Sequence, residues 1–411
     1  MIGNLKQYLS LNPKILTGLL ALVAASLPAT IKINGFIMLL SIHVWLMTVL
    51  IAKYRFKFPM APHHYLLILI FLLHVIGLIY TENLKYGLSY IERIYPLAAL
   101  PILLGSLQFS DKQLTRRVVL LAFAFSTLFA DTLYLFLPGD SLDNILSTTR
   151  TYRGLYMLFS LAIILYYAFL SPVDFTKVYE RVALYLMIPI NAFLLIQSGS
   201  KMAILLLPVV VGIFLLFYRR KRIQLINATL IIALGSLVMY YLIQQNDFVS
   251  SRIEKLATEG TDYIRLRNWK TNWSAIRENP IFGVGTGDSV DELQQRRETW
   301  WQEYIEEYNS HNQYLEITLR LGTPGLIIFI LLLSLHFMHS LRRLDFIYLI
   351  FILIFSLSCL TESLLVRQKG IVLLAFFSPF LFETSVPKRR RLDDVEEVGL
   401  STNSETPAEK Y

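Results

Sequence analysis

The stretch KMAILLLPVVVGIFLLFYRRKR, residues 201–222, decides the fold class. Residues 202–218 carry no charged side chain, and four basic residues follow directly. A helix needs about 20 predominantly apolar residues to cross the hydrocarbon core of a bilayer. Lys and Arg collect in the cytoplasmic loops of membrane proteins. The stretch therefore predicts a transmembrane helix whose carboxyl end lies in the cytoplasm.

The same pattern recurs along the chain and predicts about twelve transmembrane helices. The composition agrees, with 55% hydrophobic and 17% charged residues, against about 25% charged in soluble domains. With the amino terminus in the cytoplasm, basic residues fall in every second loop. We therefore expect a multi-pass protein of the bacterial inner membrane with both termini in the cytoplasm. The predicted helices lie near 14–31, 34–52, 64–81, 87–107, 117–138, 153–171, 181–198, 202–218, 223–243, 318–338, 344–361 and 365–383.

The expected fold is an all-α integral membrane protein with one large loop outside the cytoplasm. Residues 1–243 are expected to form transmembrane helices 1–9, and residues 314–384 helices 10–12. Residues 244–313 are too polar to cross a membrane, which predicts a periplasmic loop with interfacial helices. The tail, 385–411, turns polar and is expected to be a disordered cytoplasmic segment.

The composition disfavours several classes of function. The net charge is +8, but the basic residues flank apolar runs, so nucleic-acid binding is not expected. Cys359 is the only cysteine, which excludes an internal disulfide and a cysteine metal cluster. The histidines are scattered along the sequence, and no metal or cofactor is expected. Asp131 and the pair Glu92 and Arg93 lie within apolar runs, where such charges serve a function or pair with one another.

The large loop has a pattern of its own. Residues 263–278 place apolar side chains at helical spacing on one face, which predicts a basic amphipathic helix at the membrane surface. The glycine-rich turn GVGTG follows at 283–287, and a second, mostly acidic helical stretch is expected at 289–308. The loop then re-enters the membrane through SHN at 310–312.

Two features of the loop are typical of phosphate binding, and each has a plainer explanation. Gly283 and Gly285 could expose backbone N–H groups to a phosphate, or they could shape a tight turn between two interfacial helices. Arg265 and Arg267 could each form the planar bidentate contact that arginine makes with phosphate. Alternatively, both arginines could hold the helix against anionic lipid.

Two further residues also leave alternatives open. His311 could act as a base near neutral pH, although a lone histidine more often serves as a structural hydrogen-bonding group. Lys201 lies in a very short predicted loop outside the cytoplasm. Its ammonium group either extends to the membrane surface or binds an anionic partner.

Several motifs of this region resemble, in order and spacing, those of the O-antigen ligase and polymerase superfamily. Residues 279–285, NPIFGVG, are similar to its hP-hhGhG signature, and residues 265–269, RLRNW, to its Arg-Leu-x-x-Trp element. Residues 310–315, SHNQYL, and 321–326, LGTPGL, resemble its His-Asn-x-x-Leu and Gly-x-x-Gly-Leu elements. The resemblance covers residues 260–330 in detail and the rest of the chain only as a pattern of helices.

The resemblance implies a metal-independent membrane glycosyltransferase of GT-C type. Such enzymes take a glycan from a polyprenyl diphosphate carrier at the periplasmic face and pass it to a lipid A–core sugar, a growing chain or a protein. On this basis Arg265 engages the diphosphate and His311 activates the acceptor hydroxyl. The family tends to have Ser-Arg-Gly where this chain has SKM at 200–202, and a lysine cannot form the bidentate contact. The residues expected to bind substrate are Lys201, Arg267, Gly283, Gly285 and Asn312.

A ligase of O-antigen type is the favoured interpretation. The related polymerase, whose acceptor is a second lipid-linked glycan, is the alternative, and polymerases often have two large outside loops. A flippase or other transporter would need charged and broken helices at mid-membrane, for which only Asp131 and the pair at 92–93 are candidates. A non-catalytic membrane scaffold is the remaining interpretation.

The predicted topology can be tested with reporter fusions. Fusions at Thr286 and after Thr384 should report opposite sides of the membrane, because one site lies in the predicted periplasmic loop and the other begins the predicted cytoplasmic tail. The measurement is the activity of compartment-specific reporters in intact cells. Two fusions on the same side would contradict the topology.

Overall fold

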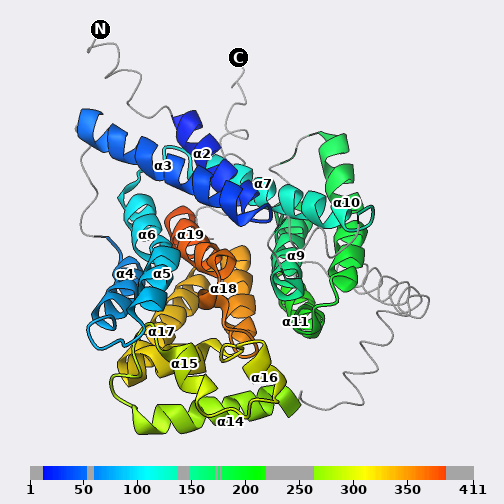
Figure 1. The fold of residues 1–411 in the computed structure, drawn as a ribbon. Coiled ribbons are helices and arrows are strands. Elements are labelled where there is room, and N and C mark those ends of the chain that lie inside the picture. The colour runs from blue at the N-terminus through cyan, green and yellow to red at the C-terminus, as the bar shows by residue number, and fades with distance from the viewer. Residues whose placement is uncertain are drawn as a thin grey trace, which may run out of the picture.

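A computed structural model of the chain describes residues 13–52, 60–137, 146, 149–171, 175, 177–218 and 263–385. These residues form helices and no strand (Figure 1). The predicted ninth transmembrane helix at 223–243, the start of the large loop at 244–262 and the tail from 386 onward lie outside the described residues.

Five of the described helices are long and apolar enough to cross a membrane, and four shorter apolar helices accompany them. The expectation of an all-helical, multi-pass membrane protein is therefore confirmed, while the total of twelve spans stays a prediction. The five long helices are Lys112–Leu133, Arg150–Leu170, Val178–Gln197, Lys201–Tyr218 and Gln313–Arg343.

The helices follow the predicted order along the chain. Those before residue 219 are α2 (Pro13–Ser26), α3 (Ile31–Ala52), α4 (Pro62–Ile76), α5 (Leu84–Ile94), α6 (Pro96–Ser106), α7 (Lys112–Leu133), α9 (Arg150–Leu165, extended by a π-helical turn at Tyr166–Leu170), α10 (Val178–Gln197) and α11 (Lys201–Tyr218). Those after residue 262 are α14 (Tyr263–Glu278), α15 (Ser289–Gln294), α16 (Gln302–Ile305), α17 (Gln313–Arg343), α18 (Phe346–Ser358), a 3₁₀ turn at Leu364–Val366 and α19 (Gln368–Thr384).

The fourth predicted span, 87–107, is not one continuous helix. It is divided into α5 and α6 at Tyr95, and Pro96 is the first residue of α6. Proline has no N–H group to donate, and its ring collides with the preceding helical turn. Proline is therefore tolerated better in the first turn of a helix than in its middle. The predicted single span did not take this effect of Pro96 into account.

The second loop helix predicted at 289–308 is wrong as a continuous element, because the chain forms only the short helices α15 and α16 there. Arg297 lies between them and donates through its Nη groups to the backbone carbonyls of Glu303 and Tyr308, at 3.1 and 2.8 Å. The chain thus folds around the guanidinium group. Burial lowers the pKa of Arg297 to about 10, which leaves it charged at neutral pH.

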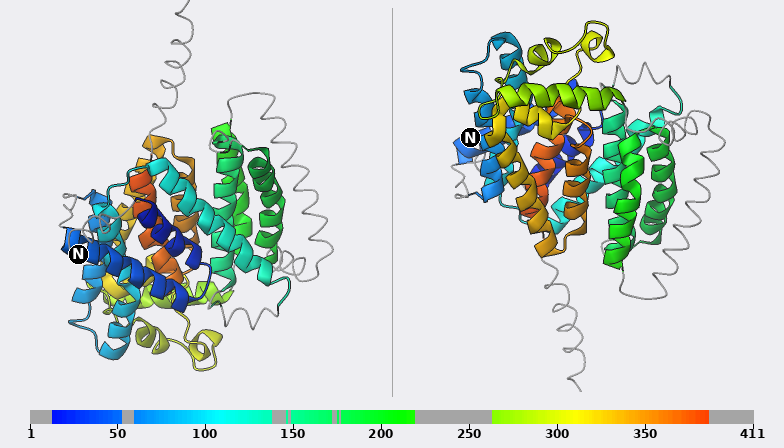
Figure 2. Two further views of the ribbon diagram at one scale, coloured as in Figure 1. Left: turned by 90° about the horizontal axis from the view of Figure 1, so that it is seen from above. Right: turned by 90° about the horizontal axis from the view of Figure 1, so that it is seen from below.

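α9 lies in the interior of the helix bundle. It is the most buried of the five long helices, whereas α10 and α11 expose most of their apolar surface, as lipid-facing helices do. Phe159 of α9 packs against Phe123 of α7, Phe351 of α18 and Phe377 of α19, with ring centroids 5.4, 5.1 and 5.2 Å apart. Figure 2 shows α9, α10 and α11 side by side, next to the helices of the carboxyl-terminal half.

The helices of the large loop cover one end of the bundle, which we call the loop end (Figures 1 and 2). α14 lies across this end and packs against α17, with α15 and α16 beside it. The bounds of α14, Tyr263–Glu278, confirm the helix predicted at 263–278, while its position at the membrane surface stays a prediction.

The glycine-rich turn between α14 and α15 rests on a kink in α17. Gly322 forms the kink with φ +67° and ψ −165°. Thr323 N–H donates to the carbonyl of Pro280 at 2.8 Å. A Cβ atom at position 322 would lie 2.1 Å from the carbonyl oxygen of Ile281. Glycine is therefore required both by the backbone conformation and by the close approach of the turn.

Histidines that are scattered in the sequence gather near the far end of α17. The ring of His63 lies 4.6 Å from that of His64, 4.7 Å from that of His336 and 6.5 Å from that of His339, measured between centroids. Residues far apart in the sequence thus form one cluster in the fold. In the part of the chain that the structure describes, no three His, Cys, Asp or Glu side chains are arranged to hold a metal ion, so the cluster does not define a metal site.

Two of the three charges that the sequence places in apolar runs, Asp131 and Arg93, have polar partners. Asp131 accepts a hydrogen bond from Arg153 Nε at 2.7 Å, and both side chains are nearly buried. Arg93 donates from Nη1 to the carbonyl of Val366 at 3.0 Å, while Glu92 is exposed. Pairing, one of the two explanations open from the sequence, therefore applies to Asp131.

Replacing Gly322 by alanine should lower the unfolding midpoint of the protein in detergent. The added Cβ collides with a carbonyl oxygen, and alanine disfavours a positive φ, so we expect a loss of more than about 1 kcal/mol. Gly212→Ala in α11 is the matched control, since no described residue has an atom within 4 Å of a Cβ added there. Equal midpoints for the two variants would show that the kink does not depend on glycine.

Candidate functional site

His311 lies in the short connection between α16 and α17. Its backbone has φ +47°, which is uncommon for residues other than glycine, and its N–H donates to Asn309 Oδ1 at 2.9 Å. The imidazole meets the ring of Tyr308 edge-on, with 5.0 Å between centroids. Its Nδ1 faces Glu362 Oε1 at 3.5 Å. Backbone conformations of this kind cluster at functional sites, where the surrounding contacts impose them.

The residues on either side of His311 are fixed by different elements. Ser310 donates from its N–H and its hydroxyl to Glu316 Oε2, at 3.0 and 2.6 Å. Asn312 caps the start of α17 with its side-chain oxygen, and its Nδ2 donates to the carbonyl of Leu360 at 3.1 Å. The backbone of His311 is therefore determined from both sides. Substrate contact by Asn312 stays a prediction, because its side chain caps α17 and bonds to Leu360 in this structure.

Glu362 is the acidic neighbour of His311, and the sequence patterns assign it no role. Asn312 N–H donates to Ser363 Oγ at 3.2 Å, and Leu365 N–H donates to Gln313 Oε1 at 2.7 Å. These bonds bring the segment after α18 beside the start of α17. The available signal in the sequence was an acidic residue in a very short connection between two apolar runs, which a search for base partners could have used.

Arg265 lies near the start of α14 and is half-buried. About one helical turn further along, Asn268 Nδ2 donates to the carbonyl of Asn309 at 2.7 Å. This bond ties α14 to the connection that carries His311. The structure therefore brings Arg265 and His311 to the same end of the bundle, on segments that are directly bonded to each other.

Arg267 is held by an ion pair. Its Nε and Nη2 donate to the two carboxylate oxygens of Glu303, at 2.9 and 2.5 Å, and its guanidinium carbon lies 4.2 Å from the centre of the Trp301 ring. Although burial raises the pKa of Glu303, the bonds from Arg267 and the backbone lower it overall, so the carboxylate stays charged. Phosphate binding by Arg267 stays a prediction and would require exchange of this pair.

Gly283 and Gly285 both have positive φ, +71° and +106°. The N–H groups of the turn donate within the protein, including Val284 to the carbonyl of Leu319 at 2.8 Å and Gly285 to that of Arg320 at 3.2 Å. These contacts support the plainer explanation, a tight turn that joins two loop helices. Substrate contact at the two glycines stays a prediction, and it could not use these N–H groups without breaking the turn.

Lys201 is the first residue of α11. The start of α11 and the segment beside His311 both pack against α9. A Cβ at Gly154 of α9 would lie 2.3 Å from the Cβ of Ser200, so the two helices touch there. In the same part of α9, the Tyr152 hydroxyl donates to the carbonyl of Leu364 at 3.2 Å. The start of α11 and the segment beside His311 therefore meet α9 at one end of the bundle. The phosphate contact of Lys201 stays a prediction.

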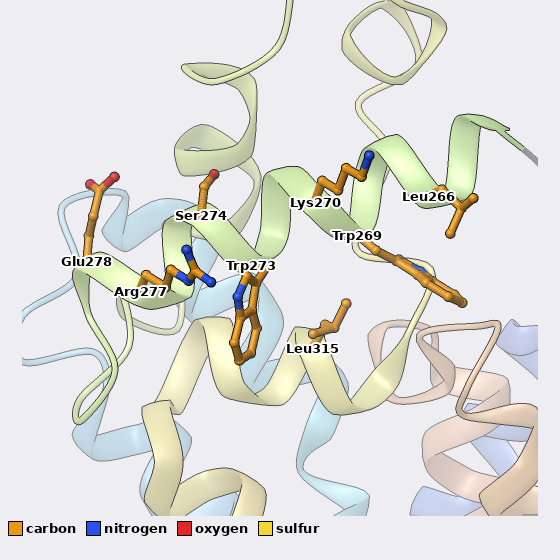
Figure 3. Close-up of a pocket in the computed structure, with 8 residues that line it drawn as sticks. All are labelled: Leu266, Trp269, Lys270, Trp273, Ser274, Arg277, Glu278 and Leu315. Atoms are coloured by element: carbon orange, nitrogen blue, oxygen red, sulfur yellow. The ribbon is translucent and has the colours of Figure 1, made fainter.

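An open groove with a volume of about 710 Å³ runs between α14 and the start of α17 (Figure 3). Trp269 and Trp273 point from α14 toward α17, where Leu315 faces them, and Arg277 borders the groove. Tryptophan rings flanked by cations are typical of the membrane–water interface. The groove therefore supports the predicted position of α14 at the membrane surface.

Two comparisons with known proteins give matches to part of this chain. Residues 182–330 match the O-antigen ligase family, a range that contains Lys201, Arg265 and His311. An uncharacterized protein of Haemophilus influenzae is 30% identical over 166 residues, which cover 36% of this chain and 40% of that protein. The match thus spans less than half of the relative. The resemblance drawn from the sequence motifs is therefore supported by a family match over residues 182–330.

Proposed function

We propose that this membrane protein is an O-antigen ligase-like glycosyltransferase. It moves a glycan from a polyprenyl diphosphate carrier to a hydroxyl group of lipid A–core, or of another acceptor, at the periplasmic face of the inner membrane. The family match at 182–330 supports the class of reaction. The predicted alternation of basic loops supports the side of the membrane.

The observation that carries the proposal is His311 held beside Glu362, with Nδ1 and Oε1 3.5 Å apart. A carboxylate at Nδ1 favours the tautomer that has its proton on that nitrogen, which leaves the lone pair of Nε2 to accept a proton. The His311 Nδ1 atom is buried and makes no hydrogen bond to any of the residues that the structure describes. Hydrogen bonds of catalytic groups often tighten only when substrate is bound. The pair therefore has the arrangement of a general base and the group that orients it.

The reaction needs a base and a stabilised leaving group. The acceptor oxygen attacks the anomeric carbon of the donor sugar, His311 Nε2 takes the hydroxyl proton, and the bond from that carbon to the diphosphate oxygen breaks. The leaving diphosphate keeps the electron pair and gains negative charge. Arg265 and Lys201 are the side chains proposed to stabilise that charge, because preorganised cations favour the transition state without a metal ion.

The related polymerase remains the alternative, since it uses the same donor chemistry with a second lipid-linked glycan as acceptor. The single large outside loop predicted from the sequence favours the ligase. Transfer to purified lipid A–core, rather than to a second lipid-linked glycan, is the outcome that would distinguish the two.

Replacing His311 by alanine should lower glycan transfer by about 10²–10⁴-fold, the usual contribution of a general base. Glu362→Gln should lower turnover by a smaller factor, because the imidazole remains but loses the carboxylate that orients it. Donor binding should be unchanged in both, since neither side chain is proposed to hold the diphosphate. The assay is transfer by purified protein, alongside a separate binding measurement.

Glu298→Gln is the control for these variants, because Glu298 is an exposed carboxylate of the same loop. Full activity of His311→Ala would remove the base from the mechanism. Loss of donor binding in Glu362→Gln would show that this carboxylate supports the fold of the site rather than the proton transfer.

Arg265→Ala should weaken both donor binding and turnover by about tenfold to a hundredfold, the effect of removing one charge-assisted bond of about 1.5–3 kcal/mol. Lys270→Ala is the matched control, because this exposed cation lies on the same helix. Transfer by the unmodified protein should persist in a chelator, since the protein's own cations neutralise the leaving group. Activity that disappears with chelator and returns with magnesium or manganese would contradict the metal-free mechanism.

A further inference from the structure

Arg153 and Asp131 form a charged pair that the mechanism above does not use. Arg153, near the start of α9, donates from Nε to Asp131 Oδ1 at 2.7 Å, with side-chain exposures of 11% and 5%. The guanidinium carbon lies 3.4 Å from the centre of the Tyr134 ring. Asp131 and Tyr134 both come from the end of α7. The plane of the guanidinium group is therefore fixed by an ion pair at one edge and an aromatic ring at one face.

The other edge of the Arg153 guanidinium is open. Among the described residues, neither Nη1 nor Nη2 donates a hydrogen bond, and neither is a fully buried atom. Arg116 shows the alternative, because both of its Nη groups donate to the Asp345 carboxylate at 2.6 Å. Arg153 instead keeps its two-pronged donor edge available while its remaining contacts hold it still. Two parallel N–H donors of this kind match two oxygens of a phosphate.

A second cation lies close to this pair. Lys369 of α19 is 3% exposed, and its ammonium group donates to the carbonyls of Ala29 and Pro28 at 2.8 and 3.4 Å. Asp131 interacts electrostatically with Lys369 as well as with Arg153. Lys369 is therefore a second basic side chain in the neighbourhood of the Arg153–Asp131 pair. A phosphate anion that approaches Arg153 would have this second basic group nearby.

The position of Arg153 fits such an anion. The next residue, Gly154, packs against Ser200 at the start of α11, and the preceding residue, Tyr152, is bonded to the carbonyl of Leu364. Arg153 thus lies on the part of α9 that joins the start of α11 to the segment beside the proposed base. A diphosphate bound near that base would therefore lie close to the start of α9, where Arg153 is.

We propose that Arg153 binds a phosphate of the lipid-linked donor through Nη1 and Nη2, and so supplies the bidentate contact that Lys201 cannot form. This inference rests on the proposed function, because it names a residue that binds the diphosphate of the donor. Asp131 and Tyr134 are positioning residues, which hold the guanidinium in place. The inference also gives a role to Asp131, a charge that the sequence places in an apolar run without explaining it.

The test is binding of farnesyl diphosphate to the purified full-length protein in detergent. Arg153→Lys keeps a cation beside Asp131 but removes the two-pronged donor, so affinity should fall about tenfold or more. Lys201→Arg alone should bind at least as tightly as the unmodified protein. The double variant with Arg153→Lys and Lys201→Arg should regain most of the affinity, because a bidentate donor returns on the neighbouring helix. Arg150→Lys, earlier on α9, is the matched control.

Several results would overturn the inference. Unchanged affinity in Arg153→Lys would do so, as would a protein that unfolds at lower temperature and regains nothing from Lys201→Arg, since the pair would then be structural only. An unmodified protein that binds no farnesyl diphosphate would also reject it. If the unmodified protein binds the probe through Arg153 but transfers no glycan, the binding site stands and the proposed function fails.

Discussion

Glu316 and Arg320, one turn apart on α17, form an ion pair with 2.7 Å between Arg320 Nε and Glu316 Oε1 and with side chains 1% and 0% exposed. Each partner also holds a second element. Glu316 accepts two hydrogen bonds from Ser310, the neighbour of His311, and Arg320 donates to the carbonyl of Thr286 in the glycine-rich turn. Removing one member of such a buried pair costs about 3–5 kcal/mol, because the other charge is left uncompensated. The position of the described part of the loop, residues 263–313, therefore depends on this pair.

Further contacts join this ion pair to other helices at the loop end. The side-chain oxygen of Asn272 of α14 lies 2.5 Å from the Ser310 hydroxyl oxygen, so α14 contacts the same serine that Glu316 holds. The Tyr90 ring of α5 lies 4.1 Å from the guanidinium carbon of Arg320, which joins the loop to the amino-terminal half of the bundle. The proposed base and the proposed phosphate-binding helix α14 would need this kind of support to act on one substrate, because reacting groups lose much of their effect when displaced by about 1 Å.

Much of this arrangement could be predicted from the sequence. The predictions that were wrong or missing have identifiable physical reasons. The apolar runs and the amphipathic pattern at 263–278 are local signals, and the helices follow them. The division at Pro96 was also a local signal, but the apolar run around it concealed the break. The sequence analysis assigned no role to Glu362 or Arg153, because the roles proposed for them depend on contacts with residues elsewhere in the chain, His311 and Asp131. Arg267 shows the reverse case: its spacing suits phosphate binding, but tertiary structure gives it Glu303 as a partner.

The most direct test of the central claim is a cryo-EM structure of the full-length protein with undecaprenyl diphosphate. The account predicts density for the two phosphates at the loop end, in contact with Arg265 and the start of α11 and with room for an acceptor hydroxyl beside His311. Phosphate density confined to the outer groove of Trp269 and Trp273, or at the opposite end of the bundle, would contradict it.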